Sequence, residues 1–173
     1  MSKKPVDYKQ FDNRWGKEPY SNHNDPRQTI ATSGSGPTLC ADIIATLIDE
    51  TVTPVTLAKL ALDLGCRTYS CGTAWSFFSK VAAFYEFPKF VQSAKWEALK
   101  ECIDAGGYVV CNMTSGYWCR TSNYILAWDY DEKYVYAVDA SSTRRHKQKI
   151  DDFKAQSRTY FCFYPIEKEA IDT

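Results

Sequence analysis

The hydrophobic pattern of this chain changes period once, close to Gly106-Gly107, and this change limits the possible folds. Before the glycine pair, apolar residues recur three and four positions apart, as in helices with one buried face. After it, the apolar runs are short and rich in β-branched and aromatic residues, as in strands. Helices followed by an antiparallel sheet predict an α+β fold, with the first helix packed on the sheet.

Four helices are expected before the glycine pair, at about 37–50, 54–64, 74–86 and 94–105. Pro37 suits the first position of the first helix, because its missing N–H is not needed there. Thr53 and Thr73 are the expected N-caps of the second and third helices. Gly65 ends the second helix and Gly106 the fourth.

The expected strands of the second part cover 108–113, 123–130, 133–140, 146–150 and 158–165, with a short turn or helix near 151–155. Asp131-Glu132 joins two of these runs in the pattern of a hairpin. The polar, turn-rich residues 8–31 are expected to wrap over the surface. No repeat or linker interrupts the chain, so residues 1–173 are expected to form a single domain.

Charge and hydropathy exclude several classes of function. Lys+Arg and Asp+Glu are balanced at 21 each, and the basic run at 144–149 is expected to be a solvated strand face, so no nucleic-acid partner is predicted. No apolar run is long enough for a membrane helix. The N-terminus lacks the apolar segment of a secretory signal, which predicts a cytoplasmic protein, although a trimmed mature form stays open.

Seven cysteines, an odd number, fit reduced thiols in a cytosolic protein better than a disulfide framework. There is no Cys-x-x-Cys pair, and there are only two histidines, His23 and His146. A metal site is therefore not expected, and no cofactor is implied.

The segment "SGSGPT" (33–38) combines a tight turn with the start of an apolar helix. Papain-like cysteine peptidases place their nucleophile in this way, at the N-terminus of the first helix. This segment is one of six that occur in the following order along the chain: "YKQFDNRWGKEPY", "SGSGPT", "TPVTLAKLA", "GTAWSFF", "YVVCNM" and "NYILAWDYDEKYVYAVDAS". This ordered set, covering about 8–150, resembles the peptidase C-thirty-nine-like family, relatives of the bacteriocin leader peptidases that cut after double glycine.

The resemblance implies a papain-like fold and four site positions. In that family the turn reads Ser-Gly-Cys-Gly-Pro-Thr, so Ser35 stands at the position of the nucleophilic cysteine. Asn123 stands where the family has its histidine base. Asp139 matches the acid that orients the histidine, and Gln10 matches the glutamine of the oxyanion hole.

Ser35 and Asn123 depart from the family pattern, and these departures would remove the nucleophile and the base. A cysteine at a helix N-terminus is activated by the helix dipole and its histidine partner, whereas a serine needs a strong adjacent base. The amide of Asn123 is not basic at neutral pH. Because loss of triad members costs several orders of magnitude in rate, we expect the chain to be inert as a papain-like peptidase.

Other residues are weighed as substitutes for the missing groups. His146 or His23 would have to reach Ser35, and a surface position is the simpler expectation for both. Cys40 lies on another side of the helix from Ser35 and is expected in the core. Cys119 is expected to be a bystander at the border of the cleft.

Substrate contacts are expected from Gly34, Trp75, Tyr117 and Trp118, which would line a groove for an extended peptide. For Trp75, a core-facing position on its helix is the competing interpretation. Tyr117 and Trp118 lie in a glycine-containing loop where core packing does not need them. Arg120 in the same loop is a candidate for binding a carboxylate.

Three hypotheses remain. The first is a pseudoenzyme that binds a peptide or protein in the retained cleft, which the double loss favours. The second is an active thiol peptidase present as an inactivated variant, since Cys→Ser is a common inactivating change that would leave the histidine in place. The third is a structural or assembly protein, bacterial or from a phage, whose cleft is filled by its own side chains.

Overall fold

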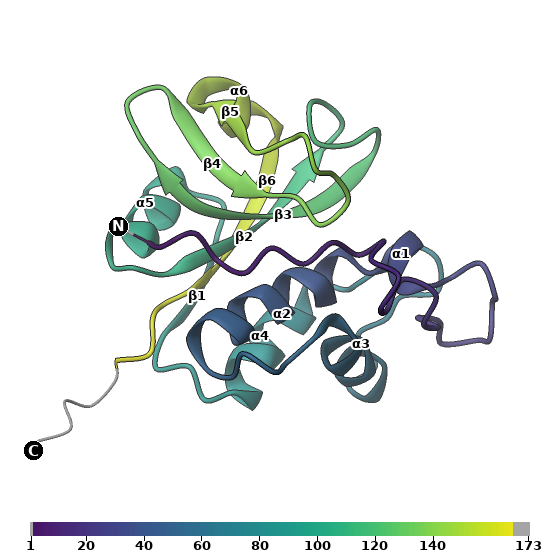
Figure 1. Ribbon diagram of the computed structural model, residues 1–173. Helices are drawn as coiled ribbons and strands as arrows, with labels where there is room; N and C mark the ends of the chain where they lie inside the picture. Colours follow the sequence, from purple (N-terminus) through teal and green to yellow (C-terminus); the bar gives the residue numbers. More distant parts are fainter. Residues whose placement is uncertain (1, 168–173) are drawn as a thin grey trace, which may run out of the picture.

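The computed structural model describes residues 2–167 and contains one six-stranded antiparallel sheet (Figure 1). The strands are β1 (Phe90–Ser93), β2 (Tyr108–Thr114), β3 (Ser122–Tyr130), β4 (Tyr134–Val138), β5 (Lys147–Lys149) and β6 (Ser157–Phe163). Their order in the sheet is β1-β6-β2-β3-β4-β5. The expected α+β fold is confirmed, and no helix of the described part is long and apolar enough to cross a membrane.

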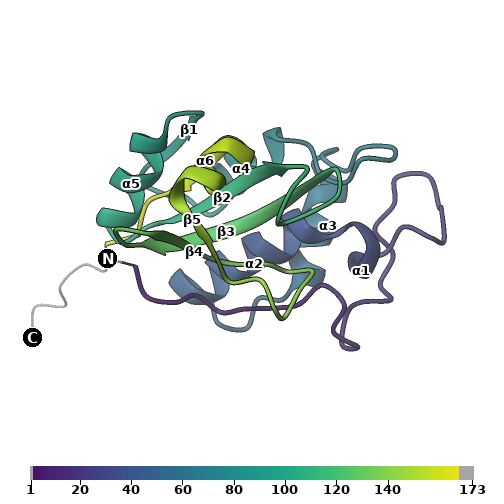
Figure 2. The ribbon, with the colours of Figure 1, turned by 90° about the horizontal axis from the view of Figure 1, so that it is seen from above.

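Helices cover both faces of the sheet. The helices are α1 (Ile30–Ser33), α2 (Ser35–Leu47), α3 (Pro54–Asp63), α4 (Ser76–Phe84), α5 (Trp96–Asp104) and α6 (Ile150–Gln156). On one face, α2, α3 and α4 pack with the strand residues Val110, Leu126 and Phe161 into the larger core. On the other face, α5 and α6 form a second core with Cys111 and Ile125, and Figure 2 shows α6 in front of the strands.

The helices follow the sequence prediction with small differences. The first long helix packs on β3 as expected, but it begins at Ser35, so Pro37 is its third residue. The N–H groups of the first turn have no partner within a helix, so proline is tolerated there too. Gly65 and Gly106, at φ +69° and +90°, follow the ends of α3 and α5. The expected cap Thr73 is wrong: Trp75 precedes α4, and the Thr73 hydroxyl bonds to Tyr20.

Two short elements were not predicted. β1, at the sheet edge, has only four residues, and α1 is a single turn inside the segment that was expected to be irregular. That segment does run over the surface, but it is anchored by two buried aromatic side chains, Trp15 and Tyr20.

The N-terminal segment lies along α2 and leads into the site (Figure 1). The Val6 N–H donates to the Thr46 hydroxyl at 2.9 Å, and the Tyr8 N–H donates to Asp42 Oδ1 at 2.8 Å. Two residues later, the Gln10 N–H donates to the Ala140 carbonyl at 2.9 Å. Side chains of α2 therefore determine where Gln10 lies.

Asp42 holds this segment with a fully buried carboxyl group, whose Oδ2 has no hydrogen-bond partner in the described part. Burial raises the pKa of Asp42 well above its ordinary value of 3.8, and the Tyr8 N–H bond opposes this only in part. The folded chain therefore binds the Asp42 proton more tightly than the unfolded chain does. This tighter proton binding stabilises the folded chain fully below about pH 3.8, and the stabilisation is lost as the pH rises through the raised pKa of Asp42.

We predict that Asp42→Asn flattens the pH dependence of stability. The asparagine keeps an acceptor for the Tyr8 N–H and has no charge to bury. Urea unfolding should show the wild type losing up to about 1.4 kcal/mol per pH unit relative to the variant above pH 4. A wild type that gains stability over Asp42→Asn as the pH rises would contradict the raised pKa.

Candidate active site

The turn before α2 is held by two glycines that leave no room for side chains. A Cβ on Gly36 would lie 3.0 Å from the Thr73 Cβ, and one on Gly34 would lie 2.7 Å from the Ile30 carbonyl oxygen. The backbone at Ile30 therefore packs against Gly34, and the loop that carries Thr73 packs against Gly36, so both neighbours of Ser35 are in close contact with the rest of the chain. The α2 N-terminus has no side-chain cap, so the helix begins with Ser35 at an open end.

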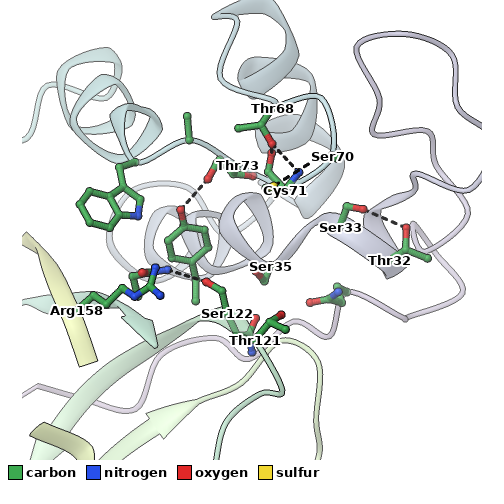
Figure 3. Close-up of a pocket in the computed structure, with 17 residues that line it drawn as sticks. Thr32, Ser33, Ser35, Thr68, Ser70, Cys71, Thr73, Thr121, Ser122 and Arg158 are labelled. Atoms are coloured by element: carbon green, nitrogen blue, oxygen red, sulfur yellow. Dashed lines mark hydrogen bonds between the residues drawn. The ribbon is translucent and has the colours of Figure 1, made fainter. Parts of the chain in front are cut away.

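Ser35 faces a pocket of about 730 Å³ between α2, the sheet and the loop that precedes α4 (Figure 3). Gln10, Ser35 and Asn123 all line it, although they are far apart in the sequence. Figure 3 shows Thr121 and Ser122 on the sheet side, and Thr68 and Cys71 on the loop side. Three of the four predicted site positions thus meet in one pocket.

Asp139 is fully buried next to Asn123. Asn123 Nδ2 donates to Asp139 Oδ1 at 3.4 Å, and the N–H and hydroxyl of Ser141 donate to the same oxygen at 2.9 and 2.7 Å. Arg145 Nη1 lies 3.6 Å from Asp139 Oδ2. The hydrogen bond to this buried carboxylate restricts the orientation of the Asn123 amide.

The Gln10 side chain is buried between the N-terminal segment and α1. Its Nε2 donates to the Ala31 carbonyl at 2.7 Å, and its Oε1 has no partner in the described part. An amide nitrogen carries two hydrogens. Gln10 lines the pocket, and the second hydrogen of its amide has no partner in the described part.

The titratable residues that line the pocket supply no general base. Among the described residues they are Cys71, Tyr124 and Arg158, with no histidine or carboxylate. Burial raises the pKa of Tyr124, whose hydroxyl donates to the Thr73 carbonyl at 2.6 Å. Nothing in this set can take the proton of the Ser35 hydroxyl at neutral pH.

Neither histidine lines the pocket. His146 lies directly before the edge strand β5, with Nδ1 3.0 Å from the Arg144 carbonyl oxygen. His23 stacks on Tyr69 at 3.9 Å between ring centroids. Cys40 is buried in the core, as expected, and Cys119 also lies outside the pocket.

The expected aromatic contacts are partly wrong. Trp75 lines the pocket and is 43% exposed, so its core-facing interpretation fails. Trp118 is only 1% exposed and bonds to Gln148, so it packs in the second core and touches no groove. Tyr117 is exposed but lies outside the pocket, and its N–H donates to Gln156 Oε1 at the end of α6. Gly34 shapes the turn without lining the pocket.

Sequence reasoning missed the loop 68–74 and Arg158. The loop contributes Thr68, Ser70, Cys71 and Thr73 to the pocket. Its run of small polar residues around Gly72 was a signal of a surface loop, but not of its position. Arg158 gave no signal, because it stands inside an ordinary strand pattern.

Comparison with solved structures identifies the fold. The peptidase domain of Streptococcus ComA, a bifunctional ABC transporter involved in quorum sensing, matches with a TM-score of 0.57 and 14% identity, over 78% of this chain and 93% of that domain. A protein described as a C39-like peptidase from Bacillus anthracis matches with a TM-score of 0.58 and 14% identity, over 97% of this chain and 100% of that one. No family model matches the chain, and neither does any curated protein sequence.

The chain therefore has the fold of papain-like C39 peptidase domains. At 14% identity this likeness concerns the fold, and the roles of single residues depend on the geometry of the pocket.

We predict that Asp139→Ala destabilises the chain by about 2–4 kcal/mol, because it removes a fully buried carboxylate that accepts three hydrogen bonds from Ser141 and Asn123 and faces Arg145. Chemical denaturation measures the loss. Asp63→Ala, an exposed carboxylate at the end of α3, is the control and should change stability by less than about 0.5 kcal/mol. Equal losses of stability in the two variants would contradict the burial and hydrogen bonding of Asp139.

Proposed function

We propose that this chain is a catalytically inactive homologue of C39 peptidases that binds a peptide or a protein segment in the retained groove. The observation that carries the proposal is the meeting of Gln10, Ser35 and Asn123 in one pocket, with Asp139 bonded behind Asn123. The arrangement of a papain-like site is kept, and the nucleophile and the base are replaced.

The chemistry of the pocket supports inactivity. A serine hydroxyl attacks a carbonyl only when a base takes its proton. The Asn123 amide is held by Asp139 and has no basic atom, and no other described side chain that lines the pocket replaces it as a base. Peptide binding requires none of these proton transfers and needs only the open groove and its hydrogen-bonding groups.

The open pocket also argues against the purely structural hypothesis, which expects the cleft to be filled by its own side chains. About 730 Å³ remains free beside Ser35, and Trp75 offers a half-exposed aromatic face to whatever occupies it. A groove of this size accepts several residues of an extended chain.

One observation supports the second hypothesis, an active thiol peptidase in an inactivated form. Asn123 keeps its bond to Asp139, so a histidine at position 123 would find its orienting acid in place. The two hypotheses predict the same binding groove, and they differ in whether the natural gene encodes serine or cysteine at position 35.

We predict that the wild type binds peptides without cutting them. A pool of unstructured peptides incubated with the protein should be recovered intact by mass spectrometry, while some members are retained on immobilised protein. Ser35→Gln, which extends a side chain into the pocket, should reduce retention at least tenfold. The matched control Ser79→Gln, on the exposed face of α4, should leave it unchanged. Cleavage that Ser35→Ala abolishes would contradict the proposal.

We predict that Ser35→Cys with Asn123→His restores a reactive thiol. Cys71 is exposed in the same pocket, so the experiment needs a Cys71→Ser background. Each unit by which the thiol pKa falls gives about tenfold more thiolate at pH 6, so alkylation by iodoacetamide should be at least tenfold faster than with Ser35→Cys alone. Equal rates in the two variants would remove the support for a peptidase site.

A further inference from the structure

Three neighbouring strands contribute polar side chains to one end of the pocket. Asn112 comes from β2, Ser122 from β3 and Arg158 from β6, and these strands are adjacent in the sheet. Figure 3 shows Ser122 and Arg158 on the sheet side, across the pocket from Thr68 and Cys71. We call Asn112, Ser122 and Arg158 the sheet end of the pocket.

Arg158 is the charged residue of the pocket. No other lysine, arginine, aspartate or glutamate lines it, and Arg158 has no carboxylate within salt-bridge distance in residues 2–167. The pairing of β2 with β6 shifts register here: Asn112 lies opposite Thr159, and Met113 lies opposite Ser157. Arg158 is the extra residue of this bulge, an irregularity that turns a side chain away from the regular strand direction.

Asn112 adds a buried group without a partner. Its side chain is 3% exposed, and its Nδ2 donates to the Ser122 hydroxyl at 3.3 Å. Its Oδ1 has no hydrogen-bond partner within the described residues. A buried amide oxygen without a partner is costly, so its position at the pocket wall favours a ligand that donates an N–H group.

We propose that the sheet end binds a carboxylate group of the peptide ligand. Arg158 pairs with the carboxylate, the Ser122 hydroxyl donates a further hydrogen bond, and Asn112 Oδ1 accepts an N–H of the ligand backbone. The carboxylate belongs to an acidic side chain or to the C-terminus of the ligand. This inference rests on the proposed function, because it names the ligand chemistry of the same groove.

The charge of the pocket supports a carboxylate over other peptide groups. Among residues 2–167 its wall carries one guanidinium and no acidic side chain, so the pocket disfavours a lysine or arginine of the ligand and favours an anion. A guanidinium matches the two oxygens of a carboxylate with two parallel hydrogen bonds. Arg120, the arginine that the sequence suggested for this role, does not line the pocket.

The test uses pools of N-acetylated hexapeptides in which one position is fixed as Glu or as Gln, each made as the free acid and as the C-terminal amide. The pools are captured on the immobilised full chain and the retained members are counted by mass spectrometry. Preference for Glu over Gln among the amides identifies a side-chain carboxylate. Preference for free acids whatever the fixed residue identifies the C-terminus.

Arg158→Gln should remove this preference and weaken the best retained peptide at least tenfold. Arg158→Lys, which keeps the charge without the paired geometry, should give an intermediate loss. Arg120→Gln, an exposed arginine outside the pocket, is the matched control and should bind like the wild type. Because Arg158 and Arg120 are both exposed and neither has a carboxylate partner among residues 2–167, we expect all three variants to melt close to the wild-type temperature.

The outcomes separate the two proposals. Peptides retained without preference for a carboxylate, or with equal affinity for Arg158→Gln and wild type, overturn the carboxylate site and leave peptide binding intact. If the wild type retains no peptide of any pool, the proposed function fails and the carboxylate site fails with it.

Discussion

The burial of α2 against the sheet is the constraint on which the site depends. Residues 36–45 of this helix are all buried, so the helix cannot shift or rotate without opening the larger core. Its N-terminus therefore ends at a fixed point, where Gly34 and Gly36 allow the preceding turn and the Thr73 loop to approach closely. Ser35 is held at this point whether or not it reacts.

The other groups of the site are brought to this fixed helix end by separate parts of the chain. Asp42 and Thr46 hold the N-terminal segment that carries Gln10, and β3 carries Asn123. Asp139, at the end of β4, binds Asn123 and Ser141, while Lys9 donates to its backbone carbonyl at 2.8 Å. Gln10 and Asn123 are thus held near this helix end by hydrogen bonds that do not involve Ser35.

Sequence reasoning was accurate where a local rule or an ordered motif applied. Periodicity located α2 to α5 and the long strands, and the motif order placed Gln10, Ser35 and Asn123, which meet in one pocket. It failed where tertiary packing determines whether a side chain is buried or which way it points. Trp118 stands in a glycine-containing loop, a local sign of exposure, yet Gln148 and the second core bury it. Arg158 enters the pocket through a register shift between β2 and β6, and no pattern within a single strand reveals a shift relative to its neighbour.

The most direct test of the account is an NMR titration of the wild-type chain with a retained peptide, following the backbone amides and the peptide in the same spectra. We expect saturable chemical-shift changes of the backbone amides of Ser35, Gly36 and Asn123, and of Asn112 and Arg158 at the sheet end. The peptide signals should stay those of the intact molecule. Shifts confined to surfaces away from Ser35, or the appearance of cleaved peptide, would contradict it.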